Sequence, residues 1–111
     1  MSIEEVSATD AAALVEGGAW LLDVRNDDEW AAGRAPTATY ITLSEVATRC
    51  REVPTDRAVI VVCRAGARSL KAAQILAEAD ITAMNLIGGM HAWEAQGLPV
   101  VTEHGTPGAV I

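Results

Sequence analysis

Short apolar runs alternate with helix-like segments along the chain. Residues 58–62 (AVIVV) form the most apolar run, which leaves no polar face for water. This composition predicts a strand that is buried on both faces of a sheet. Further strands are expected at 19–24, where Asp23 interrupts an apolar run, and at 40–43 and 83–87.

Helix-start and helix-stop residues separate these strands. Asn26, followed three residues later by Glu29, has the spacing of a capping box and predicts a short helix that Gly33 ends. After the strand at 58–62, apolar residues with a 3.6-residue period predict a helix that starts near Ser69. Three other helices are expected. One follows the cap Ser7, one follows the cap Ser44 and runs to about residue 51, and one spans 90–96.

The order of these elements predicts the fold class. Strands that alternate with helices are typical of an α/β layer fold, here with a mostly parallel sheet covered by helices on both faces. At 111 residues the chain suits one domain, which we place at 1–101. Residues 102–111 contain glycine and proline without periodicity and are expected to form a C-terminal surface tail without chemistry.

Charge and composition argue against several functional classes. Lys and Arg number 8 against 15 Asp and Glu, so a nucleic acid is not an expected partner. No stretch approaches the roughly 20 apolar residues of a membrane span, and the acidic start MSIEEVSATD is unlike a secretory signal. We therefore expect a cytoplasmic protein without a membrane partner. Its two cysteines, Cys50 and Cys63, lack the dense spacing of a disulfide scaffold and are expected to be reduced thiols.

Positive charge is concentrated in one segment of the chain. Residues 57–77 include Arg57, Arg64, Arg68 and Lys71 but no acidic residue. Because exposed charges farther apart than about 8 Å are largely screened, nearby cations decide which ligand binds. This segment is therefore a candidate anion site.

Cys63 is the residue best placed for chemistry. It directly follows the most apolar strand and precedes a helix, which is the edge of an α/β sheet where ligands bind. The loop 64–68 can turn its amides towards the sulfur, and Gly66 permits that turn. Together with Arg64 and Arg68, these amides are expected to lower the thiol pKa and favour the thiolate. The alternative is that Cys63 is a small buried apolar residue among ordinary surface arginines.

Loop length separates two reactions that suit such a thiolate. Amides and arginines around a sulfur fit the transfer of phosphoryl groups or of sulfane sulfur. Cysteine-dependent phosphatases place an arginine six positions after the nucleophile, a position that is Ser69 in this chain. Arg68 comes one residue earlier, so the loop CRAGAR is cramped for a tetrahedral phosphate but roomy enough for a second sulfur atom.

Three blocks of sequence resemble the rhodanese, or thiosulfate sulfurtransferase, family in its single-domain form. They are LLDVRNDDEWAAG, CRAGARS and GGMHAWEAQGLPV, in this order within about residues 5–100. The resemblance implies a three-layer α/β/α fold with a mostly parallel, five-stranded sheet. It also implies that Cys63 accepts a sulfane sulfur as a persulfide and passes it to cyanide or a thiol, without an organic cofactor or a metal.

The same resemblance assigns roles to residues around the cysteine. Asp23 and Arg25 match a family Asp and Arg that help to hold the active-site neighbourhood in place. Where the family has G-H-I-P-G-A, this chain has GRAPTA, with Arg34 and Thr37 as the substitutions. Our hypothesis is that Arg34 adds a cation to the pocket rim and favours anionic donors. The expected substrate-binding residues are Arg64, Ala65, Gly66, Ala67 and Arg68, with Asp23, Arg25 and Ser69 as supporting residues.

The remaining candidates have weaker signals. Cys50 is flanked by two arginines but follows no strand, so it is expected to be a half-buried structural thiol. A resolving role for Cys50 and a disulfide to Cys63 stay open. His91 and His104 have no companions at metal-ligand spacing and are expected to be solvated. The three tryptophans are expected to pack rather than to stack on a ligand.

The sequence leaves three functions open. The first is an enzyme that takes sulfur from a small anionic donor, such as thiosulfate, or from a persulfide, and transfers it through a Cys63 persulfide. The second is a sulfur carrier or interaction module in which Cys63 hands its sulfur to a protein partner. The third, a phosphatase or arsenate reductase on the same fold, is disfavoured by the length of the loop.

Overall fold

A five-stranded parallel sheet forms the centre of the molecule in the computed structural model, which describes residues 2–111. The strand order is β1-β5-β4-β2-β3, and every pairing between neighbours is parallel. This arrangement confirms the expected α/β fold with a mostly parallel sheet. The strands are β1 (Glu5–Val6), β2 (Trp20–Asp23), β3 (Thr39–Tyr40), β4 (Val59–Val62) and β5 (Met84–Leu86).

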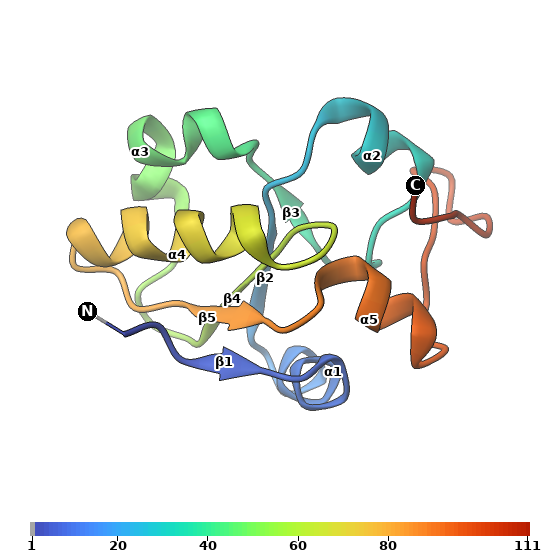
Figure 1. Cartoon of the computed structure of the whole chain (residues 1–111), viewed down its shortest axis with the longest axis horizontal. Coiled ribbons are helices and arrows are strands. Elements are labelled where there is room, and N and C mark those ends of the chain that lie inside the picture. Colours follow the sequence, from blue (N-terminus) through green and yellow to red (C-terminus); the bar gives the residue numbers. More distant parts are fainter. Residues whose placement is uncertain (1) are drawn as a thin grey trace.

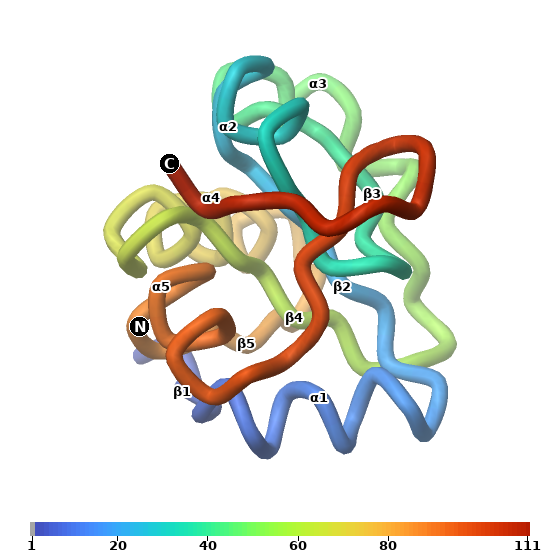
Figure 2. Tube along the Cα trace, turned by 90° about the vertical axis from the view of Figure 1, so that its right-hand side faces the viewer, coloured from blue at the N-terminus to red at the C-terminus, as the bar shows by residue number. Residues whose placement is uncertain are grey.

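Helices cover both faces of the sheet, so the fold has three layers (Figures 1 and 2). Helices α3 and α4 lie on one face and helices α1 and α5 on the other, while α2 lies on the same side of the molecule as α3 (Figures 1 and 2). The helices are α1 (Ala8–Glu16), α2 (Asp27–Ala32), α3 (Val46–Arg49), α4 (Ala67–Glu78) and α5 (Gly89–Ala95). Two 3₁₀ turns, η1 (Leu43–Glu45) and η2 (Cys50–Glu52), flank α3.

Alternation of side chains along β4 divides the core into two clusters. Val59 and Val61 point into the cluster beneath α4, whereas Ile60 and Val62 point into the cluster beneath α1 and α5. All four side chains are buried, as the apolar run predicted. Cys63 continues the alternation and lies in the cluster beneath α4.

Two of the three expected helix caps are present. Ser7 Oγ accepts a hydrogen bond from Asp10 N at 3.1 Å and opens α1. Asn26 precedes α2, and its backbone N donates to Glu29 Oε1 at 3.0 Å, which is the capping-box contact. Both starts were predicted from polar residues at the right spacing, because such side chains satisfy amides that have no partner within the helix.

Three predicted boundaries were wrong. The strand expected at 40–43 is only Thr39–Tyr40, because the chain turns into η1 at Leu43, and Ser44 lies inside that turn instead of capping a helix. The helix expected up to residue 51 is interrupted by 3₁₀ geometry at both ends. The helix expected near Ser69 starts earlier, at Ala67, because Gly66 adopts a left-handed conformation and ends the preceding loop.

Residues 102–111 fold back beside α2 and the loop after it. Ala109 N donates to Ala32 O and Gly108 N donates to Val100 O, both at 2.9 Å. The C-terminal segment thus returns to the end of the sheet where Cys63 lies (Figure 1).

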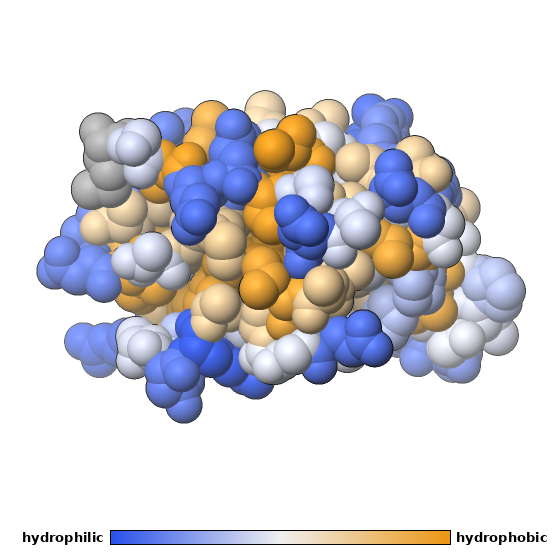
Figure 3. Space-filling view, turned by 90° about the horizontal axis from the view of Figure 1, so that it is seen from below, coloured by the Kyte–Doolittle hydropathy of each residue, from blue (hydrophilic) through white to orange (hydrophobic). Residues whose placement is uncertain are grey.

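Polar side chains cover much of the outer surface, with apolar side chains exposed between them. The view from below shows this mixture on the face that carries β1 and α1 (Figure 3). Within residues 2–111, no helix has both the length and the apolar character needed to cross a membrane.

Candidate active site

Cys63 lies immediately beyond the carboxyl end of β4, in the middle of the sheet. The neighbouring strand β2 ends beside it, because Asp23 pairs in register with Val62. The Cys63 residue is only 1% exposed, so its sulfur is surrounded by protein groups. As the sequence predicted, the cysteine lies at the carboxyl ends of the strands, where parallel sheets bind ligands.

The loop after Cys63 directs hydrogen-bond donors at the sulfur. Gly66 has φ +118°, a left-handed value that glycine adopts without a steric penalty. In this conformation Gly66 N donates to Cys63 Sγ at 3.1 Å. From the first turn of α4, Ser69 Oγ lies 3.3 Å from Cys63 Sγ.

These donors lower the pKa of the Cys63 thiol. Burial alone raises this pKa, since it removes the thiolate from water. Hydrogen bonds from the Ser69 hydroxyl and from the amides of Ser69, Gly66 and Ala65 outweigh the effect of burial. The pKa of Cys63 therefore lies below the usual value for a thiol, which favours the reactive thiolate.

The start of α5 holds the other side of the loop. Met90 N donates to Cys63 O at 2.8 Å, and His91 N donates to Arg64 O at 3.1 Å. Gly89 lies so close that a Cβ at this position would collide with the Cys63 and Arg64 carbonyls. Gly89 at the start of α5 is therefore a close contact point for the loop.

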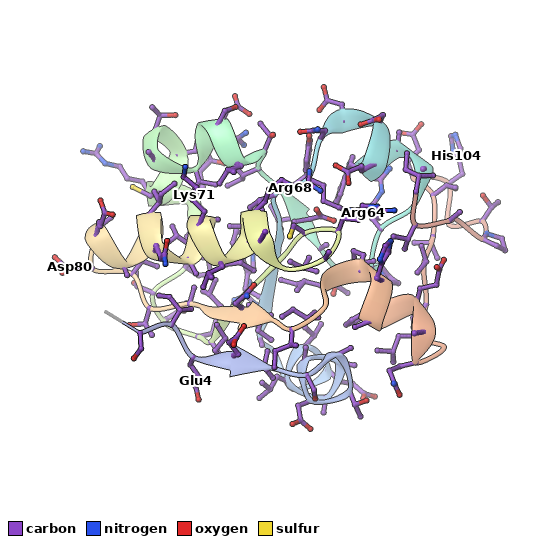
Figure 4. All side chains as sticks on the ribbon, viewed as in Figure 1. Glu4, Arg64, Arg68, Lys71, Asp80 and His104 are labelled. Atoms are coloured by element: carbon purple, nitrogen blue, oxygen red, sulfur yellow. The ribbon has the colours of Figure 1, made fainter. Side chains whose placement is uncertain are left out.

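Both arginines of the loop have protein partners. Arg68 makes a bidentate ion pair with Glu29, with N–O distances of 2.7 and 2.8 Å. This pair holds the pKa of Glu29 at about 2, and Glu29 in turn raises the pKa of Arg68. Arg64 Nε donates to the main-chain oxygen of Ile111 at 2.7 Å. Figure 4 shows Arg64 and Arg68 at the same end of α4, whereas Asp80 lies at its opposite end.

Asp23 and Arg25 form a fully buried ion pair beside the site. Arg25 Nη2 lies 2.7 Å from Asp23 Oδ2, and neither side chain is exposed. The same Nη2 donates to Gly33 O at 2.7 Å, which ties the end of β2 to the end of α2. Such contacts fit the expected supporting role, because the partner of each buried charge is supplied within the fold.

Arg34 extends over aromatic side chains. Its guanidinium carbon lies 4.1 Å from the centre of the Trp30 ring, which stacks on Tyr40 at 4.9 Å. Burial and a hydrogen bond to Asp27 raise the pKa of Tyr40 to about 12. Thr37 is exposed. The role of Arg34 in donor binding stays a prediction.

Asn85 is a site residue that the sequence reasoning did not identify. It lies on β5 and is 2% exposed, and its Oδ1 is 2.6 Å from Ser69 Oγ. Its Nδ2 donates to Gly66 O at 3.3 Å, so the side chain contacts both residues whose donors lie near the sulfur. A polar residue in the otherwise apolar run AMNLI was the available signal.

The weaker candidates lie outside this cluster. Cys50 is half-buried and packs against the core beneath α4, and both cysteines are free thiols. His91 and His104 are exposed, as expected. Among residues 2–111, no group of three His, Cys, Asp or Glu side chains is arranged to hold a metal ion.

Fold and site together define an α/β protein with an activated cysteine in a loop that leads into a helix. The rhodanese-like domain model matches residues 7–96. The chain therefore belongs to the rhodanese-like family, as its three sequence blocks suggested.

Individual relatives agree with this assignment. A protein of Allochromatium vinosum named sulfurtransferase is 38% identical over 86 residues, covering 77% of this chain and 80% of that protein. Thiosulfate sulfurtransferase GlpE of Actinobacillus pleuropneumoniae is 32% identical over 102 residues, covering 90% and 94% of the two chains. The crystal structure of a rhodanese-related protein from Thermoplasma volcanium superposes with a TM-score of 0.84 at 27% identity, covering 90% of this chain and 99% of that one.

Proposed function

We propose that this protein is a sulfurtransferase that carries sulfur as a persulfide on Cys63. The observation that carries the proposal is the pair of donors on one buried sulfur, Gly66 N at 3.1 Å and Ser69 Oγ at 3.3 Å. These groups stabilise a thiolate, which is the nucleophile in exchange at sulfur. Membership of the rhodanese-like family and relatives named sulfurtransferase support the same reaction class.

The reaction proceeds in two balanced displacements. With thiosulfate as donor, the Cys63 thiolate attacks the outer sulfur and forms a new S–S bond, while the S–S bond of thiosulfate breaks and sulfite leaves with its electron pair. A thiolate or cyanide acceptor then attacks the outer sulfur of the persulfide. Cys63 leaves with the bonding electron pair and becomes a thiolate again, so no external oxidant or reductant is consumed.

The loop supplies the electrostatic part of this chemistry. Its amides point at Cys63 Sγ, where negative charge resides before the first step and after the second. Arg68 is held in place by Glu29, and we propose that it contributes positive potential beside the loop instead of gripping an anion in bidentate fashion. A six-residue loop CRAGAR favours a small sulfur donor over a phosphate ester.

Intact mass spectrometry after incubation with thiosulfate tests the proposal. The expected result is one added sulfur, about 32 Da, which peptide mapping locates on Cys63 and which cyanide removes as thiocyanate. An unmodified Cys63 after incubation with both thiosulfate and an organic persulfide would overturn it. Steady turnover from thiosulfate to cyanide indicates the enzyme, loading with slow turnover indicates the carrier module, and hydrolysis of p-nitrophenyl phosphate indicates the phosphatase.

A further inference from the structure

Ser69 has one hydroxyl proton and three possible acceptors. Its Oγ lies 2.6 Å from Asn85 Oδ1, 3.2 Å from Gly66 O and 3.3 Å from Cys63 Sγ. Since a serine hydroxyl donates one hydrogen bond at a time, these acceptors compete for it. The shortest distance is to Asn85, so the amide oxygen is the strongest competitor of the sulfur.

Contacts on the far side of Asn85 fix the orientation of its amide. Asn85 Nδ2 donates to Glu5 Oε2 at 3.2 Å and to Gly66 O at 3.3 Å. A carboxylate and a carbonyl only accept hydrogen bonds, so a reversed amide would place its oxygen against two other oxygens. Asn85 Oδ1 therefore faces Ser69, and at 2.6 Å it is placed to accept the hydrogen bond of the hydroxyl.

We propose that Asn85 is a positioning residue that controls when Ser69 donates its hydroxyl proton to Cys63. While Cys63 is a thiol, the Ser69 hydroxyl donates to Asn85 Oδ1, and the Cys63 S–H proton faces the lone pairs of Ser69 Oγ. When the thiol loses its proton to solvent, the hydroxyl rotates to the negative sulfur. This proposal rests on the proposed function only in that Cys63 works as a thiolate.

The same switch returns the hydroxyl to Asn85 during sulfur transfer. In a persulfide the negative charge is on the outer sulfur, so Cys63 Sγ becomes a weak acceptor and Asn85 Oδ1 again accepts the hydrogen bond of the Ser69 hydroxyl. Once the outer sulfur leaves, the charge is again on Sγ and the hydroxyl rotates back. The Ser69 proton thus follows the charge, and Asn85 raises the pKa of Cys63 above the value that an uncontested Ser69 would give.

Substitutions at Asn85 and Ser69, which are both uncharged, leave the charged groups near the loop in place. These groups are the Arg68–Glu29 and Asp23–Arg25 pairs, Arg64, and Glu5 at the far side of Asn85.

The variant Asn85→Val removes the competing acceptor without changing any charge. In a Cys50→Ser background, the pH dependence of the rate of iodoacetamide alkylation gives the pKa of Cys63. We expect Asn85→Val to lower this pKa by about half to one pH unit, or about three- to tenfold in the thiolate-to-thiol ratio. Ser69→Ala is expected to raise it, and Ser69→Thr, which keeps the hydroxyl, to leave it near the wild-type value.

A double variant separates proton control from loop support. Asn85→Val is expected to have no effect on the pKa of Cys63 when Ser69→Ala is already present, because no hydroxyl proton is left to direct. An unchanged or higher pKa in Asn85→Val, or an equal drop in the Ser69→Ala background, would overturn the proposal. If Asn85 only supported the loop, Asn85→Val would raise the pKa of Cys63, because the Gly66 amide would be held less firmly against the sulfur.

If Asn85→Val does not fold, an NMR measurement on protein that keeps Asn85 tests the same proposal. The NMR signals of the Asn85 side-chain amide are expected to shift with the ionisation of Cys63, and this shift is expected to disappear in Ser69→Ala. Signals that stay constant through the titration of Cys63 would overturn the proposal. None of these measurements uses a sulfur donor, so a failure of sulfur loading rejects the proposed function and leaves the test of Asn85 intact.

Discussion

The two cysteines of this chain differ in their oriented donors far more than in nearby charge. Cys50 has arginines on both sides in the sequence, but Arg49 is bound to Glu52 at 2.8 Å and lies 3.4 Å from Glu45. Cys63 has two arginines in the loop that follows it, and one of them, Arg68, is bound to Glu29. In both regions a carboxylate binds one of the arginines, so the number of nearby arginines does not set the two apart.

What distinguishes Cys63 is a set of neutral donors fixed by the backbone. An amide and a hydroxyl lie within 3.3 Å of its sulfur, and the amides come from a loop whose carbonyls are docked on α5. Donors that are already oriented stabilise a thiolate without the cost of reorganising solvent or side chains. In this chain, backbone geometry beside each cysteine therefore separates the two thiols better than the count of basic neighbours does.

Exchange of each cysteine for serine is the strongest test of this comparison. Cys63→Ser is expected to abolish sulfur loading from thiosulfate, since serine Oγ cannot carry a sulfane sulfur. Cys50→Ser is expected to keep loading and turnover near the wild-type level. Mass spectrometry and thiocyanate production measure the two effects. Equal loss from both substitutions would indicate a two-cysteine redox mechanism and would remove the distinction between the regions.

The arginine pairs near the two cysteines are expected to differ greatly in their effect on stability. Arg25→Met leaves the Asp23 carboxylate buried and unpaired, which is expected to cost about 3 to 5 kcal/mol of unfolding free energy. The matched variant Arg49→Met breaks an exposed pair, so the urea midpoint is expected to stay nearly unchanged. Urea unfolding followed by circular dichroism measures both variants. Similar midpoints for the two would show that burial does not separate these pairs.

Acid is expected to weaken the Arg68–Glu29 ion pair in a defined pH range. The pKa of Glu29 is about 2 in the folded protein and 4.5 for an ordinary glutamate, so the unfolded state binds protons first as pH falls. The contribution of Glu29 to stability is therefore complete above about pH 4.5 and is lost as pH falls towards 2. Glu29→Gln is expected to lower stability by about 1 to 3 kcal/mol at neutral pH and to remove this part of the pH dependence.

Glu52→Gln is the matched control near Cys50. Its hydrogen bond with Arg49 also lowers the pKa of Glu52, but this pair is exposed and solvent screens it. Urea titrations between pH 2 and 6 are therefore expected to change far less in this variant than in Glu29→Gln. An equal change in both variants would contradict the role given to the Arg68–Glu29 pair.

Local signals in the sequence were enough to predict the position of Cys63 in the fold. The apolar run of β4 ends at Val62, so Cys63 had to lie at the sheet edge, and Gly66 allowed the turn that aims its amide at the sulfur. The capping box of Asn26 and Glu29 was also predicted correctly. These features involve residues that are close in sequence, for which spacing alone restricts the geometry.

Contacts between distant segments were beyond such reasoning. Glu29 was predicted as a capping residue, but its second partner, Arg68, is 39 residues away and meets it only when α2 and α4 pack together. Asn85 on β5 likewise reaches Ser69 on α4 only in the folded protein. Strand β1 has only two residues and so lacks any period that would reveal it.

Arg34→Ala is expected to have the smallest effect, and it tests whether a charge away from the sulfur contributes to donor binding. Its guanidinium stacks on Trp30, so it is held near one place while its charge remains. If it lies at the pocket rim, Arg34→Ala is expected to raise the thiosulfate KM about two- to threefold at low salt, with kcat unchanged. Because about 1 M salt shortens the screening length to about 3 Å, the difference is expected to vanish there. An unchanged KM at low salt would show that neutral donors around Cys63 act without help from this cation.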